Sequence, residues 1–205
     1  MNRAFAWLIT AAGAFVAACS SMPPAESTAV VPDLKQGGYV IVFRHGGTNR
    51  DMADTDPLHI DNVSQQRQLS AGGREQARQV GEAFRKLGVP LGKVYTSQFN
   101  RAVETGKLIS GKDPITTPDV TEGGQVVTPI ENDRRAAAFR TLAGTKPDAG
   151  TNTLIVSHKP NIIDAFGKDW FEVREGEATV FRPDGNGKFV PVGRLQAVDW
   201  IKAAK

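Results

Sequence analysis

Cysteine is almost absent from this sequence of 205 residues, in which Cys19 is the only one. A single cysteine cannot form a disulfide within the chain, and it excludes zinc and redox sites that need several thiolates. Long basic runs are absent too. The formal net charge of +3 is too small and too dispersed for a surface that binds nucleic acid. We therefore expect no nucleic-acid partner.

A long apolar run is also missing. The stretch from Ala4 to Ala18 is apolar, but its roughly 15 residues fall short of the about 20 that a membrane-spanning helix needs. Because Arg3 precedes it and small residues end it, this stretch is typical of a secretory signal. Residues 1–18 are therefore predicted to be a signal peptide that is removed.

The end of this apolar stretch has a second feature. Val16-Ala17-Ala18-Cys19 resembles the lipobox of bacterial lipoproteins, in which the cysteine receives a diacylglyceryl group and becomes the mature N-terminus. The resemblance implies lipidation of Cys19, and a plain signal peptide cleaved nearby is the alternative. We expect a chain in the bacterial periplasm that is anchored by lipid to a membrane, the outer membrane in particular.

The composition changes twice after the signal. Ser20 to about Gln36 is rich in Ser, Pro, Ala and Glu and has little periodicity, so residues 19–36 are predicted to form a flexible tether. Residues 37–205 contain no internal repeat and have the length of one domain with a core of its own. The sequence therefore predicts a signal, a tether and a single domain.

Strand-like and helix-like segments alternate within that domain. Short apolar and β-branched runs predict buried strands at Tyr39–Phe43, Lys93–Thr96 and Thr153–Val156. Helices are predicted from the N-cap Ser70 to Leu87, over Asn100–Ile109 and Glu131–Ala143, and from Pro160. Further extended segments are predicted at Thr116–Thr121, Ala178–Phe181 and Phe189–Leu195, with a hairpin turn at residues 184–187. This order predicts an α/β domain with a mostly parallel central sheet flanked by helices.

Cations and imidazoles follow the three buried strands. Arg44 and His45 end the first, Arg101 lies just beyond the second, and His158 follows the third. Because ligands of open α/β sheets bind outside the carboxyl ends of the strands, we expect these side chains to converge. Guanidinium groups match phosphate oxygens with paired donors, and nearby positive charge keeps an imidazole neutral and nucleophilic. The pattern predicts a site for a phosphoryl group.

Four segments resemble, in order, the motifs of the histidine phosphatase superfamily, in the branch that includes phosphoglycerate mutases. They are Val40–Thr48, which contains the RHG motif, then Leu69–Ala77, Ser97–Thr105 and Ile155–Lys159. The resemblance covers roughly residues 38–167 and implies a phosphoglycerate mutase-like fold.

The resemblance also implies roles for single residues. His45 would accept the phosphoryl group as the nucleophile, while Arg44, Arg101 and His158 would bind that group and stabilise the transition state. Members of the family need a carboxylic acid to protonate the leaving oxygen, and Glu122 is the candidate. Nearby carboxylates compete for this role: Asp119, Glu131 and Asp133.

Two assignments stay open on the residues alone. Thr48 belongs to the RHG segment, and its hydroxyl either donates to the phosphate or caps a helix. Arg134 and Arg135 either reach a second anionic group of the substrate or lie solvated on a helix face.

The function expected is that of a metal-independent phosphomonoesterase that acts on a phosphorylated small molecule of the envelope or periplasm. No cofactor is expected, because arginines and imidazoles supply the positive charge that a metal would bring. The Asp-rich stretch 51–56 also lacks the glycine and the final glutamate of a calcium loop. The alternative is a non-catalytic lipoprotein that uses the same side chains to bind a phosphorylated envelope ligand.

Overall fold

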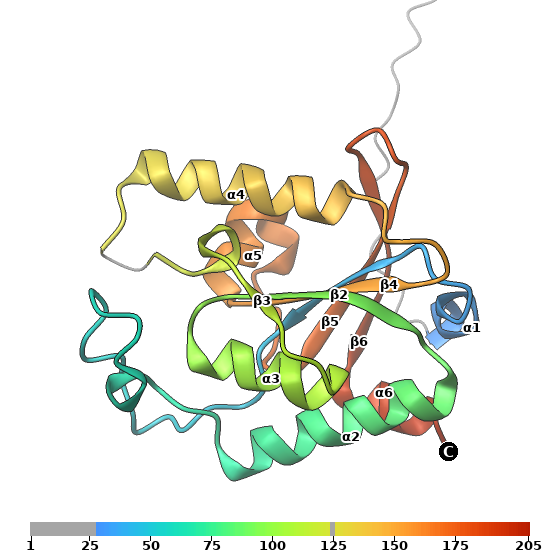
Figure 1. Cartoon of the computed structure of the whole chain (residues 1–205), viewed down its shortest axis with the longest axis horizontal. Helices are drawn as coiled ribbons and strands as arrows, with labels where there is room; N and C mark the ends of the chain where they lie inside the picture. Colours follow the sequence, from blue (N-terminus) through green and yellow to red (C-terminus); the bar gives the residue numbers. More distant parts are fainter. Residues whose placement is uncertain (1–27, 124–125) are drawn as a thin grey trace, which may run out of the picture.

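The structure, a computed structural model, describes residues 28–123 and 126–205, and these form one α/β domain around a six-stranded sheet (Figure 1). The strand order is β3-β2-β4-β1-β5-β6. The strands are β1 (Val40–Arg44), β2 (Leu91–Thr96), β3 (Ile115–Thr116), β4 (Asn152–Ser157), β5 (Glu177–Pro183) and β6 (Phe189–Gln196). β3, β2, β4 and β1 run parallel to one another, whereas β5 is antiparallel to both of its neighbours, β1 and β6. The predicted single α/β domain is confirmed, with a mixed sheet.

Helices cover both faces of the sheet (Figure 1). One face carries α1 (Val31–Leu34), α2 (Ala71–Leu87), α3 (Asn100–Ser110) and α6 (Ala197–Ala203), and the other carries α4 (Pro129–Gly144) and α5 (Lys159–Phe166). The predicted N-cap is present, because the Ser70 hydroxyl accepts a hydrogen bond from Gly73 N at 3.0 Å. Gly88 ends α2 in the left-handed conformation, with a φ of 66°.

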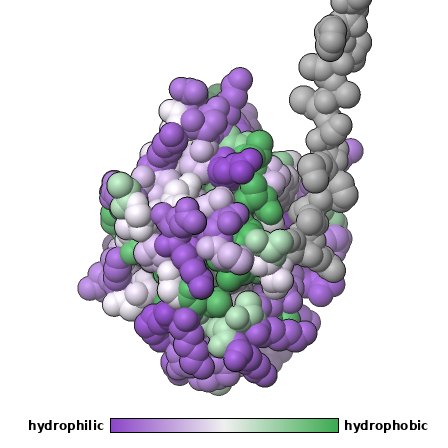
Figure 2. Space-filling view, turned by 90° about the vertical axis from the view of Figure 1, so that its right-hand side faces the viewer, coloured by the Kyte–Doolittle hydropathy of each residue, from purple (hydrophilic) through white to green (hydrophobic). Residues whose placement is uncertain are grey.

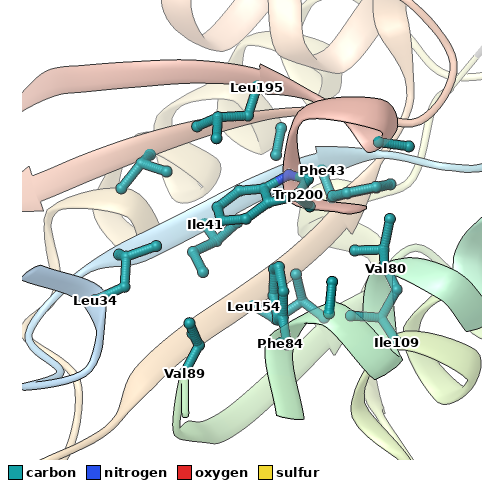
Figure 3. Packing of buried hydrophobic residues seen from close by; sticks show 14 of the residues in the cluster. Leu34, Ile41, Phe43, Val80, Phe84, Val89, Ile109, Leu154, Leu195 and Trp200 are labelled. Carbon is teal, nitrogen blue, oxygen red and sulfur yellow. The ribbon is translucent and has the colours of Figure 1, made fainter. Parts of the chain in front are cut away.

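Burial on both sides explains the continuous apolar run of β1. Ile41 and Phe43 face one core cluster, while Val40 and Val42 face the other, as the two-residue period of a strand requires. Trp200 lies in the first cluster, against the Phe84 ring at a centroid distance of 4.8 Å (Figure 3). The helix that carries Trp200, α6, was not among the predicted elements.

The flexible tether predicted for residues 19–36 is wrong for its described part, residues 28–36. A 3₁₀ turn (Thr28–Val30) leads into α1, and Val30, Val31 and Leu34 are buried in the core. Their apolar side chains decide the outcome, because removing them from water stabilises an ordered segment. The predicted signal peptide, Cys19 and the rest of the tether lie outside the described residues.

The extended segment predicted at Thr116–Thr121 is also only partly present. β3 contributes two residues, and Pro118–Val120 then form a 3₁₀ turn that Thr117 caps through its hydroxyl. The proline sets a turn-compatible φ and removes a backbone donor, so the strand stops there.

The site-bearing ends of β1 and β4 lie on the left of Figure 1, beside the long loop after β1. The opposite end of the molecule, shown in Figure 2, is mostly hydrophilic around a narrow apolar stripe. Among the described residues no helix is long and apolar enough to cross a membrane.

Candidate active site

Strand pairing brings the two predicted imidazoles together. β1 and β4 are parallel neighbours, Arg44 is aligned with Ser157, and His45 N donates to Ser157 O at 3.1 Å. His45 and His158 therefore leave adjacent strands at the same level, and their ring centroids lie 5.1 Å apart. β2 joins them on the other side of β4, where Ser97 N donates to Val156 O at 3.0 Å.

The loop after β1 is held against the start of α2. Gly47 O accepts from Ser70 N at 2.9 Å and from the Ser70 hydroxyl at 3.1 Å. The backbone of Gly73 lies so close that a Cβ there would be 2.0 Å from Gly47 O. Gly46 N donates to the Thr105 hydroxyl of α3 at 3.1 Å. These contacts fix the backbone that carries His45.

His45 is oriented for attack through Nε2. Its Nδ1 lies 2.8 Å from Gly46 O, which is an acceptor only, so the ring proton is assigned to Nδ1. The lone pair of Nε2 is then free. The side chain is buried, with 2 % of its surface exposed, so the backbone carbonyl rather than water decides the tautomer.

His158 is fixed by a serine that precedes α3. Its Nε2 lies 2.7 Å from the Ser97 hydroxyl, which in turn accepts from Phe99 N at 3.1 Å. The Ser97 proton is then directed at Nε2, which assigns the His158 proton to Nδ1. Nδ1 lies 3.4 Å from Glu122 Oε1.

Arg101 is fully buried at the centre of the site. Its Nη1 donates to Asp54 Oδ1 at 2.9 Å, and its Nη2 is paired with Glu122 Oε1. The guanidinium carbon also lies 4.3 Å from the centroid of the Phe99 ring, and the same ring packs edge-on against His158. The Phe99 ring thus orients both Arg101 and His158.

Glu122 is the predicted acid that the structure brings to the site, where its side chain is 19 % exposed. The three competitors lie elsewhere: Asp119 and Glu131 are paired with Arg134, and Asp133 is on α4. Glu122 alone among these carboxylates contacts both Arg101 and His158.

Arg44 and Thr48 share a carboxylate that the sequence did not single out. Arg44 Nη1 donates to Val173 O at 2.7 Å, and its Nη2 lies 3.7 Å from Glu175 Oε1. The Thr48 hydroxyl donates to the same Glu175 oxygen at 2.8 Å. Thr48 therefore caps no helix, and its hydroxyl proton is already engaged.

Burial and charge keep both imidazoles neutral. Loss of hydration lowers the pKa of His45 well below 6.5, and His158, Arg101 and Arg44 lower it further. Burial likewise lowers the pKa of His158 well below 6.5, followed by the charges of Arg101, Arg67 and Arg44. The expected effect of nearby positive charge on His45 is thus present, and desolvation is the larger cause.

Besides Glu175, sequence reasoning missed three residues of the site. Ser97 belongs to a matched motif, so that motif was a signal for it. Asp54 and Arg67 lie in the polar loop between β1 and α2, which has no periodicity or motif, and Asp54 Oδ1 accepts from Arg67 N at 2.9 Å. Only the folded loop shows that Asp54 contacts Arg101 and that Arg67 lies next to Asp54.

Two cavities flank the buried residues. One, of about 340 Å³, is lined by apolar side chains such as Phe99, Ile60 and Val127 and by polar ones that include Glu122, Asp54, Gln98 and Arg135. The other, of about 600 Å³, is lined by Arg44 and further cations. A phosphoryl group among Arg44, His45, Arg101 and His158 would lie between them.

Comparisons with known sequences agree with this site. Residues 40–124 match the model of the histidine phosphatase superfamily, branch 1. The mitochondrial serine/threonine-protein phosphatase Pgam5 of Drosophila persimilis is 37% identical over 84 residues, which are 41% of this chain and 25% of that protein. Pgam5 of Drosophila grimshawi is 35% identical over 75 residues, 37% of this chain and 23% of that protein. The chain thus spans about a quarter of the length of these curated relatives.

Comparisons with solved structures agree on the fold. The protein histidine phosphatase SixA complexed with tungstate has a TM-score of 0.55 at 18% identity, and the match covers 78% of this chain and 98% of that one. The phosphoserine phosphatase of Entamoeba histolytica has a TM-score of 0.55 at 16% identity, with the same coverage of 78% and 98%. Residues 40–124 thus resemble the histidine phosphatase superfamily, and the fold resembles those of SixA and of the phosphoserine phosphatase.

Proposed function

We propose that the protein is a metal-independent phosphomonoesterase that works through a phosphohistidine at His45. The observation that carries this proposal is the hydrogen bond from His45 Nδ1 to Gly46 O at 2.8 Å. It leaves the Nε2 lone pair of a neutral, buried imidazole free beside Arg44, Arg101 and His158. An imidazole held in this way is an activated nucleophile.

The reaction has two steps. In the first, His45 Nε2 forms a bond to phosphorus while the bond from phosphorus to the ester oxygen breaks, and Glu122 gives that oxygen its proton. Arg44, Arg101 and the Nδ1–H of His158 stabilise the charge on the three phosphoryl oxygens. In the second, Glu122 takes a proton from water, and the water oxygen displaces His45 to release phosphate.

The position of Glu122 favours an enzyme over the alternative of a binding lipoprotein. A protein that only holds a phosphorylated ligand has no use for a carboxylate next to the leaving oxygen, because its charge repels the dianion. Glu122 nevertheless contacts both Arg101 and His158. This arrangement supports turnover.

The first experiment measures hydrolysis of p-nitrophenyl phosphate by the full-length chain and by its His45→Ala variant. We expect turnover by the wild type and a loss of at least a thousandfold in the variant. Acid-labile, alkali-stable label on His45 after mixing with ³²P-labelled substrate would identify the intermediate. A folded wild type that binds orthovanadate but does not turn over would instead favour the binding lipoprotein.

The location is part of the proposal. We propose that the chain is exported, lipidated on Cys19 and held on the periplasmic face of the outer membrane, where it acts on a phosphorylated small molecule of the envelope or periplasm. The lipobox-like residues Val16–Cys19 support it. Mass spectrometry of the membrane fraction tests it, with Cys19→Ala as the variant expected in the soluble fraction. An unmodified Cys19 in the wild type would contradict the anchor.

A further inference from the structure

The larger cavity beside the site is strongly basic. It has a volume of about 600 Å³, which is within the usual range for small-molecule sites. We call it the basic groove and define it by its five cationic residues, Arg44, Arg50, Arg67, Lys159 and Arg174. Arg44 belongs to the phosphoryl site as well, so the groove continues directly from it.

The charges of the groove are largely uncompensated. Its two carboxylates are Glu172 and Glu175, and Glu175 is already shared between Arg44 and Thr48. Across residues 28–123 and 126–205, no carboxylate is paired with the guanidinium of Arg50, Arg67 or Arg174. Cations that converge on a cavity without partners favour an anionic ligand.

Lys159 and Arg67 lie where the groove meets the phosphoryl site. Lys159 directly follows His158 in the sequence, and its ammonium lies 4.5 Å from the centroid of the Phe171 ring. The Arg67 Nε is buried and has no hydrogen-bond partner in the described part of the chain. An unpaired buried donor is costly unless a ligand or water completes it. The backbone N of Arg67 is held by the Asp54 carboxylate that also binds Arg101.

The other arginines considered for a second anion are already neutralised. Arg134 is paired with Glu131 and Asp119, and Arg135 is paired with Glu131 and donates to Thr121 O. Their guanidiniums therefore offer less to a ligand than those of the basic groove. These pairings favour the basic groove over the arginines of α4 as the place for a second anion.

We propose that the substrate carries two phosphate groups, one that lies at His45 and is cleaved and one that binds in the basic groove. This inference rests on the proposed function, because it takes the residues around His45 as the site of the reaction. Guanidiniums are suited to the second phosphate, since their paired N–H donors match its oxygens. The remainder of the groove has room for a small polyol or sugar between the two groups.

The kinetic test compares glucose 1,6-bisphosphate with glucose 1-phosphate and glucose 6-phosphate as substrates of the full-length chain. We expect kcat/KM for the bisphosphate to exceed that for either monophosphate by at least tenfold. The double variant Arg50→Gln/Arg174→Gln should bring this ratio close to one. Arg85 is an exposed arginine in the last turn of α2, and Arg85→Gln is the matched control. It should leave kcat/KM for all three sugars unchanged.

A binding test separates this inference from the proposed function. Calorimetry on the full-length His45→Ala variant measures the affinity for the same three sugars without turnover, and we expect the bisphosphate to bind at least tenfold more tightly. If the wild type hydrolyses p-nitrophenyl phosphate, but neither kcat/KM nor the affinity is higher for the bisphosphate, the bisphosphate inference alone is overturned. Tight, groove-dependent binding without any hydrolysis would overturn the enzymatic function and support the second-phosphate site.

Discussion

At the scale of single residues, the role proposed for Glu122 as the acid can be tested separately from that of the proposed nucleophile His45 by the choice of leaving group. We expect Glu122→Gln to lower kcat for glycerol phosphate by about 10²- to 10⁴-fold. The loss should be much smaller for p-nitrophenyl phosphate, because p-nitrophenolate leaves without a proton. Asp119→Asn is the control, since Asp119 is paired with Arg134 outside the site. Equal losses with both substrates would show that Glu122 only positions Arg101.

In the proposed mechanism, Asp54 would compete with the substrate for Arg101. Its carboxylate accepts from Arg101 Nη1 at 2.9 Å, so a dianion bound at Arg101 would meet the negative charge of Asp54. Asp54→Asn keeps the shape and removes the charge, so we expect orthovanadate to inhibit p-nitrophenyl phosphate hydrolysis at about threefold to tenfold lower concentration, as expected for one partly screened charge pair. Weaker inhibition would mean that Asp54 chiefly positions the guanidinium.

The buried imidazoles make stability depend on pH. The pKa values of His45 and His158 lie well below 6.5 in the folded chain and near 6.5 when it is unfolded. Below about pH 6.5 the unfolded state therefore binds protons that the folded state does not, so the free energy of unfolding falls as the pH falls. Above that pH the full stability is present.

Denaturant unfolding between pH 8 and pH 5 measures this dependence. Each imidazole contributes a slope of at most about 1.4 kcal/mol per pH unit. His45→Gln should make the slope shallower. A flat free energy of unfolding from pH 7 to pH 5.5 would contradict the neutral, buried state of the two rings.

At the scale of elements, the start of α2 acts as a support for the loop that carries His45. Gly73→Ala would place a Cβ 2.0 Å from Gly47 O and 2.8 Å from Gly47 N. Because these are backbone atoms, the loop has to move. We expect a loss of about 1 to 3 kcal/mol in the free energy of unfolding and a loss of most of the phosphatase activity.

Gly72→Ala is the matched control for this contact. A Cβ at Gly72 meets nothing closer than the Ser70 hydroxyl at 3.9 Å, and alanine is the better helix former. Stability should therefore stay equal or rise slightly, and activity should be kept. Full activity in Gly73→Ala would show that the loop after β1 adjusts freely, contrary to the close packing described.

At the scale of the whole molecule, the proposed function takes the positive charge that stabilises the phosphoryl group from arginines and imidazoles at one end of the sheet. Chelators should therefore leave p-nitrophenyl phosphate hydrolysis unchanged. Orthovanadate should raise the melting temperature, because a ligand at 100 times its dissociation constant adds about 2.7 kcal/mol to the stability. A rate that falls with chelator and returns with a divalent metal would contradict a site built from arginines and imidazoles alone.

The sequence by itself determined the central strands, the main helices and the four residues Arg44, His45, Arg101 and His158. Local signals were strong there, since β1 and β4 are buried on both faces and α2 has a capping serine and a terminal glycine. The family motifs also lie at strand ends, where the topology of an α/β sheet brings them together. The roles of these residues in the reaction remain predictions.

Only the tertiary structure decided what surrounds them. We predicted a tether at Val30, Val31 and Leu34 because a short amphipathic segment has no strong period of its own. These residues are ordered because they pack on the core. Asp54, Arg67 and Glu175 reach the site from loops in which neither spacing nor periodicity marks a position. Contacts between residues far apart in the sequence depend on the path of these loops over the folded domain, and no local pattern encodes that path.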